Sequence, residues 1–288
     1  MDICEGDERD VIRLIATDLD DTLLDAKSAL TERTLAALKA AMAVGCGVAI
    51  SSGRMLEATL PFARAIGVNA PMLIYNGAML YDPVADEALY ARRVPYEVAL
   101  SVVKIVEAAG SYVQLYPGKG YYCEEVLDRT RAYERQINVP VTAVHMPLSR
   151  WLEAHPGDLQ KLLIIDSSAE NADRLQAELR AACPRGASFL KSKPHYIEVM
   201  PEGVDKGAAL RQLAELLGLV PEEVMAFGDG QNDVPMLRFA GAGYAMANAS
   251  CEVRACTPNI APPNTDDGVA QVIERYLAEG RLGPLKME

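Results

Sequence analysis

The stretch TDLDDTLL, residues 17–24, places three carboxylates within four positions. It follows directly on the mostly apolar run VIRLI, residues 11–15, which predicts a buried strand. Like charges this close repel one another, so they do not stabilise a fold by themselves. We therefore expect the aspartates at the end of this strand to be there for what they bind.

Alternating apolar runs and helical periods around this stretch predict an α/β fold. Residues 46–51 (CGVAIS) and 71–76 (PMLIYN) are expected to be strands, because they are short and apolar. Strands that alternate with helices imply a parallel sheet with crossover helices. The predicted helices of this part are residues 31–44 and 56–66. The pattern resumes late in the chain with a helix at 206–217, a strand at 224–227 and helices at 234–239 and 268–278.

The middle of the chain predicts a second α/β unit. Helix-like and strand-like stretches alternate between residues 96 and 200, and proline-containing segments on either side are typical of hinges. A chain of 288 residues, half of them apolar, also exceeds the usual size of one domain. We expect a core domain formed by residues 1–88 and 200–288, and an inserted domain formed by residues 89–199.

Composition narrows the classes of partner. Acidic residues outnumber basic ones by 40 to 28, a formal net charge of −12, which argues against a nucleic-acid partner. No apolar run reaches the roughly 18 residues of a membrane span, and the acidic N-terminus lacks the apolar region of a signal peptide. Six scattered cysteines without a C-x-x-C pair are typical of reduced thiols. We expect a soluble cytoplasmic protein, a monomer or homodimer, with no membrane partner.

Four polar loops are expected to meet at one edge of the predicted sheet. We place each of them after a core strand: TDLDDT (17–22), SSGR (51–54), VDKG (204–207) and GDGQND (228–233). In open α/β sheets the ligand site lies beyond the carboxyl ends of the strands, so these loops converge although they are far apart in sequence. Each loop alone is also consistent with an ordinary turn or helix cap, whereas the four together favour a functional site.

The residue types in these loops favour phosphoryl transfer through a covalent intermediate. Asp18 and Asp20 are two positions apart, so on an extended backbone both side chains point to the same side. One carboxylate can then attack phosphorus while the other handles a proton. Clustered carboxylates need a cation, and Mg²⁺ prefers hard oxygen ligands together with a substrate phosphate. Ser52, the Gly53 amide and Lys206 can hold the phosphate oxygens that are not transferred.

Together the motifs resemble those of the haloacid dehalogenase (HAD) superfamily, specifically its Cof-type subfamily IIB phosphatases with a C2-type cap. The resemblance covers nearly the whole chain. It implies a Rossmann-like core, with a parallel sheet sandwiched by helices, and an inserted α/β cap domain. The matching segments are DLDDT (18–22), SGR (52–54), YNGA (75–78), GVDKG (203–207), GDGQND (228–233) and NTDDGVA (264–270).

The resemblance also implies roles for individual residues. Asp18 would be the nucleophile that forms an aspartyl-phosphate, and Asp20 would be the general acid for the leaving alcohol and then the base for water. Mg²⁺ would be held by Asp18, the backbone carbonyl of Asp20 and Asp229, with Asp233 alongside. The residues that would position the phosphate are Ser52, Gly53, Lys206 and Asn232.

The sequence departs from the motifs of this family at two positions, and two further residues each have two possible roles. Asp21 replaces the glycine often seen in the first motif, and Ser52 replaces threonine but keeps the hydroxyl. Arg54 is expected either to contact substrate or to make a structural ion pair. Asn76 is expected either to contact substrate or to fix a loop by a hydrogen bond.

These residues favour a Mg²⁺-dependent phosphatase that acts on a small phosphorylated metabolite, such as a sugar phosphate. The cap would close over the substrate, exclude water and set specificity. One alternative keeps the aspartyl-phosphate chemistry and changes the acceptor, as in a sugar phosphomutase or phosphotransferase. Another is a non-enzymatic phospho-acceptor of the receiver type. Receiver domains are far shorter, however, and they lack both an inserted domain and the GDGQND loop.

Overall fold

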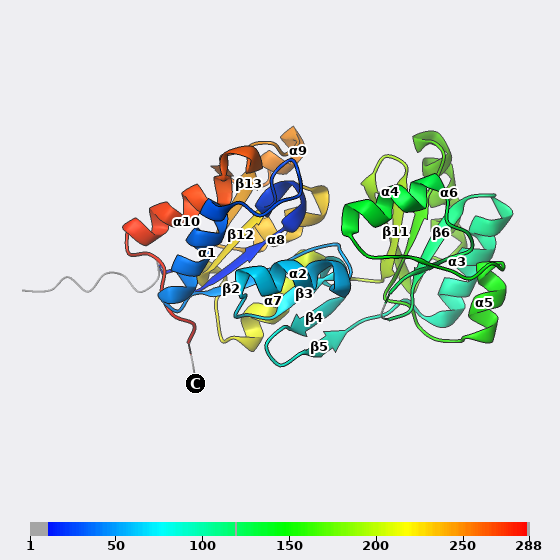
Figure 1. Cartoon of the computed structure of the whole chain (residues 1–288), viewed down its shortest axis with the longest axis horizontal. Helices are drawn as coiled ribbons and strands as arrows, with labels where there is room; N and C mark the ends of the chain where they lie inside the picture. Colours follow the sequence, from blue (N-terminus) through cyan, green and yellow to red (C-terminus); the bar gives the residue numbers. More distant parts are fainter. Residues whose placement is uncertain (1–10, 119, 287–288) are drawn as a thin grey trace, which may run out of the picture. The chain divides into compact units, whose positions relative to one another are not determined.

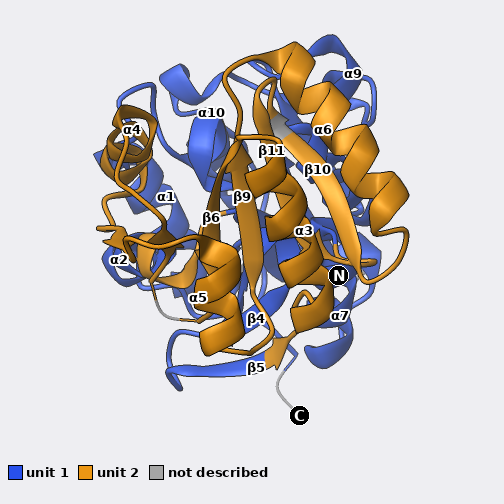
Figure 2. Cartoon of the chain, turned by 90° about the vertical axis from the view of Figure 1, so that its right-hand side faces the viewer, with its two compact units in different colours: residues 1–53, 59–89, 205–288 blue, residues 54–58, 90–204 orange. Residues whose placement is uncertain are grey.

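The computed structural model describes residues 11–118 and 120–286 (Figure 1). The acidic N-terminal decapeptide and its Cys4 lie outside the described residues. The chain divides into two compact units, which Figure 2 shows in different colours. Unit 1 consists of Met1–Gly53, Thr59–Leu89 and Asp205–Glu288, and unit 2 consists of Arg54–Ala58 and Tyr90–Val204.

Unit 1 is built on a five-stranded parallel sheet with β1 (Leu14–Thr17) buried between its neighbours. In the β1 register, Thr17 pairs with Ile50 at the end of β2 and with Phe227 near the end of β12. The carboxyl ends of these three strands therefore lie at the same edge. The full order is β14 (Asn259–Ala261), β13 (Ala242–Met246), β12 (Val224–Gly228), β1 and β2 (Gly47–Ile50).

Helices pair beside this sheet, with α1 packed along α10 and α7 along α8 (Figure 1). The start of α1 is fixed by Thr31, whose hydroxyl accepts from the Thr34 amide, and its end is followed by Gly45 at φ 86°. The helices of this part are α1 (Glu32–Ala43), α2 (Leu56–Ile66), α7 (Lys206–Leu216), α8 (Val234–Phe239), α9 (Cys251–Arg254) and α10 (Gly268–Ala278).

The strand expected at residues 71–76 forms and runs parallel to the end of β2, to which it is linked by a single parallel bridge between Leu73 and Ser51 and by a hydrogen bond of 2.7 Å from the Ser52 amide to the Leu73 carbonyl. Its regular partner is a different strand, which was not predicted. β3 (Met72–Ile74) pairs antiparallel with β4 (Met79–Asp82) in a three-stranded sheet that β5 (Glu87–Ala91) completes. The short turn Tyr75–Gly77 reverses the chain within three residues. A turn this tight can join only antiparallel strands, so it dictates the pairing with β4, whereas the parallel bridge to the end of β2 follows the longer crossover that contains α2.

Unit 2 contains a six-stranded, mainly antiparallel sheet. Alternate side chains of its middle strands, such as Val113, Leu115, Leu162 and Ile164, form one buried apolar cluster with side chains of α3, α5 and α6. The strand order is β10 (Ala187–Lys193), β11 (Tyr196–Pro201), β9 (Lys161–Ile165), β6 (Tyr112–Tyr116), β7 (Tyr122–Cys123) and β8 (Thr142–Ala143). The helices are α3 (Tyr96–Ala108), α4 (Asp128–Ile137), α5 (Leu148–Ala154) and α6 (Ala169–Ala182).

The loop VDKG is placed differently from the prediction, because it does not follow a core strand. It comes after β11, which belongs to the sheet of unit 2. Lys206 is instead the first residue of α7, and the Asp205 side chain caps this helix by accepting from the Ala208 amide at 2.7 Å. A helix start, rather than a strand end, therefore positions Lys206.

The predicted α/β class is confirmed, with a parallel core sheet and a second α/β unit. Among the described residues, no helix is both long and apolar enough to cross a membrane.

Candidate active site

The site begins where β1 ends. Asp18 is 7% exposed, and its amide donates to the Phe227 carbonyl of β12 at 3.0 Å, which fixes the backbone at the strand end. The chain then turns sharply at Asp21, where φ is 59°. The Asn248 carboxamide donates to the Asp21 carbonyl at 2.8 Å and holds this left-handed turn. The turn brings the buried Thr22 hydroxyl back toward the β12 loop.

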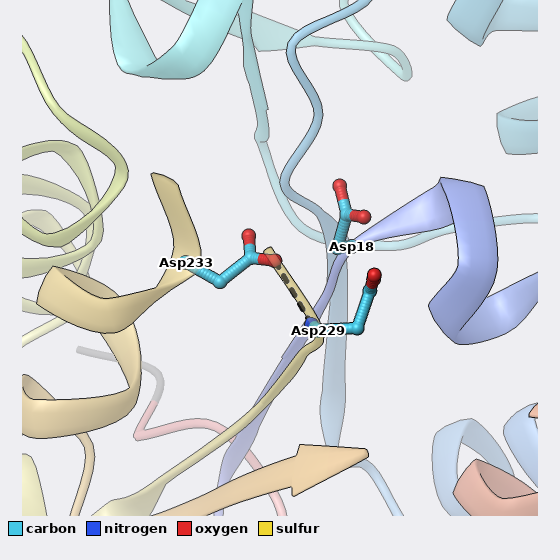
Figure 3. A group of neighbouring side chains, drawn as sticks. All are labelled: Asp18, Asp229 and Asp233. Carbon is cyan, nitrogen blue, oxygen red and sulfur yellow. Dashed lines mark hydrogen bonds between the residues drawn. The ribbon is translucent and has the colours of Figure 1, made fainter. Parts of the chain in front are cut away.

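Three carboxylates meet at this edge of the sheet. Asp18, Asp229 and Asp233 each place one oxygen within 4.8 Å of the others (Figure 3). The Asp233 Oδ2 accepts from the amides of Asp229 and Gly230 at 3.0 and 2.8 Å, so this carboxylate is fixed by its own loop. A Cβ at Gly228 would lie 2.4 Å from the Asp233 Cβ, and only glycine fits there. The predicted convergence of the β1 and β12 loops is therefore present.

Lys206 lies between two of these carboxylates. Its Nζ donates to Asp18 Oδ1 and to Asp233 Oδ1, both at 2.6 Å, and its side chain is fully buried. Burial alone would lower the pKa of Lys206, but the charges of Asp18 and Asp233 outweigh that effect and raise the pKa above its ordinary value. The ammonium is therefore charged, and it supplies positive charge at the centre of the acidic cluster.

The Asp18 carboxyl needs a positively charged neighbour such as Lys206 in order to ionise. Burial raises the pKa of Asp18 well above its ordinary value, and the charges of Asp233 and Asp229 raise it further. The Lys206 ammonium opposes this rise. A second cation beside Asp18 would act in the same direction as Lys206.

Asp229 is perturbed in the same way. Burial raises the pKa of Asp229 to about 6, the charges of Asp233 and Asp21 add to the rise, and a hydrogen bond from Thr22 opposes it. That hydrogen bond, from Thr22 Oγ1 to Asp229 Oδ1, is 2.7 Å long. Thr22 belongs to the first sequence motif, but no role was predicted for it, although its place in that motif was the available signal.

The predicted phosphate-binding loops are joined by Asn76. Its amide donates to the Ser52 carbonyl at 3.0 Å, and its Oδ1 accepts from Asn232 Nδ2 at 2.9 Å. A Cβ at Gly53 would lie 2.9 Å from the same Oδ1. The hydrogen bonds that fix loops, one of the two expectations for Asn76, are thus present, and a substrate contact by Asn76 stays a prediction.

The two other predicted site residues are Asp20 and Arg54. Asp20 is half-buried in the turn after Asp18, and its carboxylate is not one of the three that meet in Figure 3. Its predicted metal contact used the backbone carbonyl and stays a prediction. Arg54 is buried and belongs to unit 2, so its expected substrate contact or ion pair also stays a prediction.

Comparison with known proteins places this site in context. The sequence model of a family described as haloacid dehalogenase-like hydrolase matches residues 15–273. Pyridoxal phosphate phosphatase YbhA of Escherichia coli (strain K12) is 30% identical over 283 residues, which cover 92% of this chain and 98% of YbhA. The 5-amino-6-(5-phospho-D-ribitylamino)uracil phosphatase YitU of Bacillus subtilis (strain 168) is 27% identical, with coverage of 92% and 97%.

Solved structures agree with these sequence relatives. A haloacid dehalogenase-like hydrolase from Bacteroides thetaiotaomicron superposes with a TM-score of 0.83 at 28% identity, over 92% of this chain and 99% of that one. TM0651 from Thermotoga maritima gives a TM-score of 0.81 at 32% identity, with coverage of 92% and 97%.

Proposed function

Since the chain belongs to the haloacid dehalogenase-like hydrolase family, we propose that it is a Mg²⁺-dependent phosphatase that hydrolyses small phosphate monoesters through an aspartyl-phosphate on Asp18. One observation carries the proposal. Asp18, Asp229 and Asp233 meet at the ends of β1 and β12, and the buried Lys206 ammonium donates to Asp18 and Asp233. This is the arrangement that a nucleophilic carboxylate beside a divalent cation requires.

Family membership confirms the resemblance that the motifs predicted, and with it the expectation of an HAD-type phosphatase. Two relatives carry names that specify small phosphorylated substrates, pyridoxal phosphate for YbhA and a phosphoribitylamino uracil for YitU. These names support a small phosphorylated metabolite as the substrate of this chain, with sugar phosphates as a further class to test.

The donor set fits a magnesium ion. Asp18, Asp229 and Asp233 offer hard carboxylate oxygens close enough to share one ion, and Mg²⁺ takes oxygen ligands and keeps several waters. The backbone carbonyl of Asp20 is the fourth ligand that we propose. When bound, the ion would offset the repulsion among the carboxylates and neutralise part of the phosphate charge.

In the proposed reaction, a carboxylate oxygen of Asp18 attacks phosphorus, and the bond from phosphorus to the ester oxygen breaks. Asp20 gives its proton to the leaving alcohol oxygen. Asp20 then takes a proton from water, whose oxygen attacks the phosphorus of the aspartyl-phosphate. Inorganic phosphate leaves and the Asp18 carboxylate is restored. Lys206 holds Asp18 in place throughout, because its ammonium donates to Oδ1.

The remaining phosphate oxygens need donors. We assign this role to the Ser52 hydroxyl, the Gly53 amide, the Asn232 carboxamide and the Lys206 ammonium. The first three belong to loops that Asn76 connects, and Lys206 lies between two of the carboxylates. Ser52 is almost fully buried, so its hydroxyl is part of a fixed surface rather than a mobile one.

Several wider expectations stay predictions. The division into a core (1–88 and 200–288) and a cap (89–199) would assign substrate selection to unit 2. A cytoplasmic location is consistent with the free thiols of the five described cysteines. The choice between a monomer and a homodimer needs a measurement of mass in solution.

The proposal is tested by phosphate release from a panel of monoesters, with Mg²⁺ and with a chelator. We expect release by the wild type only with the cation, and no release by Asp18→Asn. Asp173→Asn, which changes an exposed aspartate on α6, is the matched control and should keep wild-type activity. No release by the wild type from any ester, with phosphate transferred to an added sugar instead, would favour the phosphotransferase alternative.

A further inference from the structure

The turn between β3 and β4 is unusual because three consecutive residues have positive φ. The angles are 52° at Tyr75, 55° at Asn76 and 91° at Gly77. A left-handed backbone is unfavourable for a bulky residue such as tyrosine, yet Tyr75 and Asn76 are only 1% and 4% exposed. Buried strain of this kind persists only where the surroundings determine it, and it clusters at functional sites.

This turn contacts the start of α7. A Cβ at Gly77 would lie 2.6 Å from the Ala209 Cβ and 2.7 Å from the Asp205 carbonyl oxygen. Asp205 is the capping residue of α7, directly before Lys206. The left-handed turn is therefore packed against the element that carries the buried lysine.

Asn76 itself contacts the two other loops that we assign to phosphate. Its backbone amide donates to Ser52, its Oδ1 accepts from Asn232, and the same oxygen fills the space above Gly53. A carboxamide nitrogen has two N–H donors. Because Asn76 takes one donor of Asn232 Nδ2, it fixes the plane of the carboxamide and so the direction of the second donor.

We propose that Asn76 is a positioning residue, which orients the Asn232 carboxamide so that its second N–H meets a phosphate oxygen. This inference rests on the proposed function, because it concerns how the same site binds phosphate. It assigns Asn76 an effect on phosphate affinity that acts through Asn232.

The test compares Asn76→Gly with the wild type, using p-nitrophenyl phosphate as substrate and inorganic phosphate as inhibitor, both with Mg²⁺. Glycine adopts positive φ freely, so this variant removes the side chain and keeps the turn. We expect KM and the inhibition constant of phosphate to rise about 10-fold, the scale of one hydrogen bond to a charged group. Asn138→Gly is the control, because Asn138 is an exposed residue of unit 2 with φ 53°.

Asn232→Ala is then added to each background. We expect it to weaken phosphate inhibition in the wild type and to cause no further loss in Asn76→Gly, because a disoriented Asn232 no longer contributes. Asn76→Asp keeps the accepting oxygen and tolerates a left-handed backbone. In that background Asn232→Ala should still cause a loss, and this arm decides the matter if Asn76→Gly does not fold.

If the losses of phosphate affinity caused by Asn76→Gly and by Asn232→Ala multiply in the double variant, the two residues act independently and the inference is overturned. The inference is also overturned if Asn232→Ala weakens phosphate inhibition in the wild type but has no effect in the Asn76→Asp background. A wild type without Mg²⁺-dependent turnover would instead contradict the proposed function. The two failures are therefore distinguishable.

Discussion

Lys206 is the residue that most directly links stability to chemistry in this chain. The sequence predicted a lysine that holds phosphate, and the structure shows its ammonium bound to Asp18 and Asp233. No pattern in GVDKG reveals those partners, because they come from two other loops and meet Lys206 only in the folded chain. The aspartates of the opening stretch are tolerated partly because this buried cation balances them.

Lys206→Met should therefore destabilise the protein as well as inactivate it. Two buried carboxylates would lose their cation, and breaking a buried pair in this way costs about 3 kcal/mol of unfolding free energy. We expect added Mg²⁺ to restore part of that loss, because the ion supplies positive charge at the same place. Chemical denaturation with and without Mg²⁺ measures both effects.

The control for this experiment is Lys104→Met. Lys104 pairs with Glu153 on the surface of unit 2, where solvent screens the interaction. Its loss should leave the unfolding free energy nearly unchanged. Equal destabilisation by the two substitutions would contradict the assignment of Lys206 as a buried counter-charge.

Thr22→Val tests how Asp229 is oriented. The substitution keeps the shape of the buried side chain and removes its hydrogen bond to Asp229 Oδ1. We expect Mg²⁺ affinity, measured by calorimetry, to fall about 10-fold, as is typical when a partner of a metal ligand is lost. Thr257→Val loses a comparable hydrogen bond, to the Gly243 carbonyl, and should leave Mg²⁺ affinity unchanged.

At the scale of elements, the best predictions were helices with a clear apolar period. The bounds of α2, α8 and α10 agree with those expected from the sequence. By contrast, β13 and β14 were not predicted. They are short, contain glycine, alanine and asparagine, and owe their form to pairing with β12 and with each other rather than to strand propensity.

The sheet partner of β3 shows a second kind of limit. The apolar run PMLIYN predicts a strand, but apolar residues alone do not show that this strand also pairs antiparallel with β4. The following Asn76-Gly77 pair is a strong turn signal, and it was the part of the sequence that indicated a reversal of direction. The strand was therefore predictable from its residues, whereas its partner depended on the turn.

The C-terminal segment is tied to the start of the core sheet through Glu223. Its Oε1 accepts from Arg13 Nε at 2.9 Å and lies 2.8 Å from Lys286 Nζ, and the Gly283 amide donates to the Ile12 carbonyl. Burial alone would raise the pKa of Glu223, but the hydrogen bonds from Lys286, the Val220 amide and Arg13 outweigh it and lower that pKa below its ordinary value of 4.5.

Glu223→Gln should therefore destabilise the protein in a pH-dependent way. A carboxyl whose pKa is lowered by folding stabilises the folded state above pH 4.5, and this contribution is lost as the pH falls through the lowered value. After screening by solvent, we expect a loss of about 1 kcal/mol at pH 7. Denaturation at pH 7 and pH 3 measures it, and a difference that persists undiminished at pH 3 would contradict the ion-pair account.

At the scale of the whole molecule, the sequence predicted which loops form the site better than how they are supported. Asp18, Asp229 and Asp233 converge as expected, because parallel strands end at one edge. The supporting contacts of Thr22 and Asn248 were not predicted, and for Asn76 a loop-fixing hydrogen bond was only one of two expectations. Each depends on side-chain geometry across segments distant in sequence, which a pattern of residue types does not encode.

Mg²⁺ should stabilise the whole chain through this one site. An ion that binds the folded state alone contributes about 2.7 kcal/mol at a concentration 100 times its dissociation constant. We expect a higher melting temperature with Mg²⁺ in the wild type and little change in Asp229→Asn, measured by differential scanning calorimetry. Equal stabilisation of both proteins would place the ion elsewhere.

The aspartyl-phosphate on Asp18 is tested most directly by rapid-mixing kinetics of Asp20→Asn with p-nitrophenyl phosphate and Mg²⁺. This substrate has a leaving group that needs little acid assistance, so Asp18 can still be phosphorylated while the attack of water is slowed. We predict a burst of about one p-nitrophenolate per enzyme followed by slow turnover, and no burst when Asp18→Asn is added. Undiminished steady turnover by Asp20→Asn would contradict the role of Asp20, and a burst that survives Asp18→Asn would contradict the aspartyl-phosphate on Asp18.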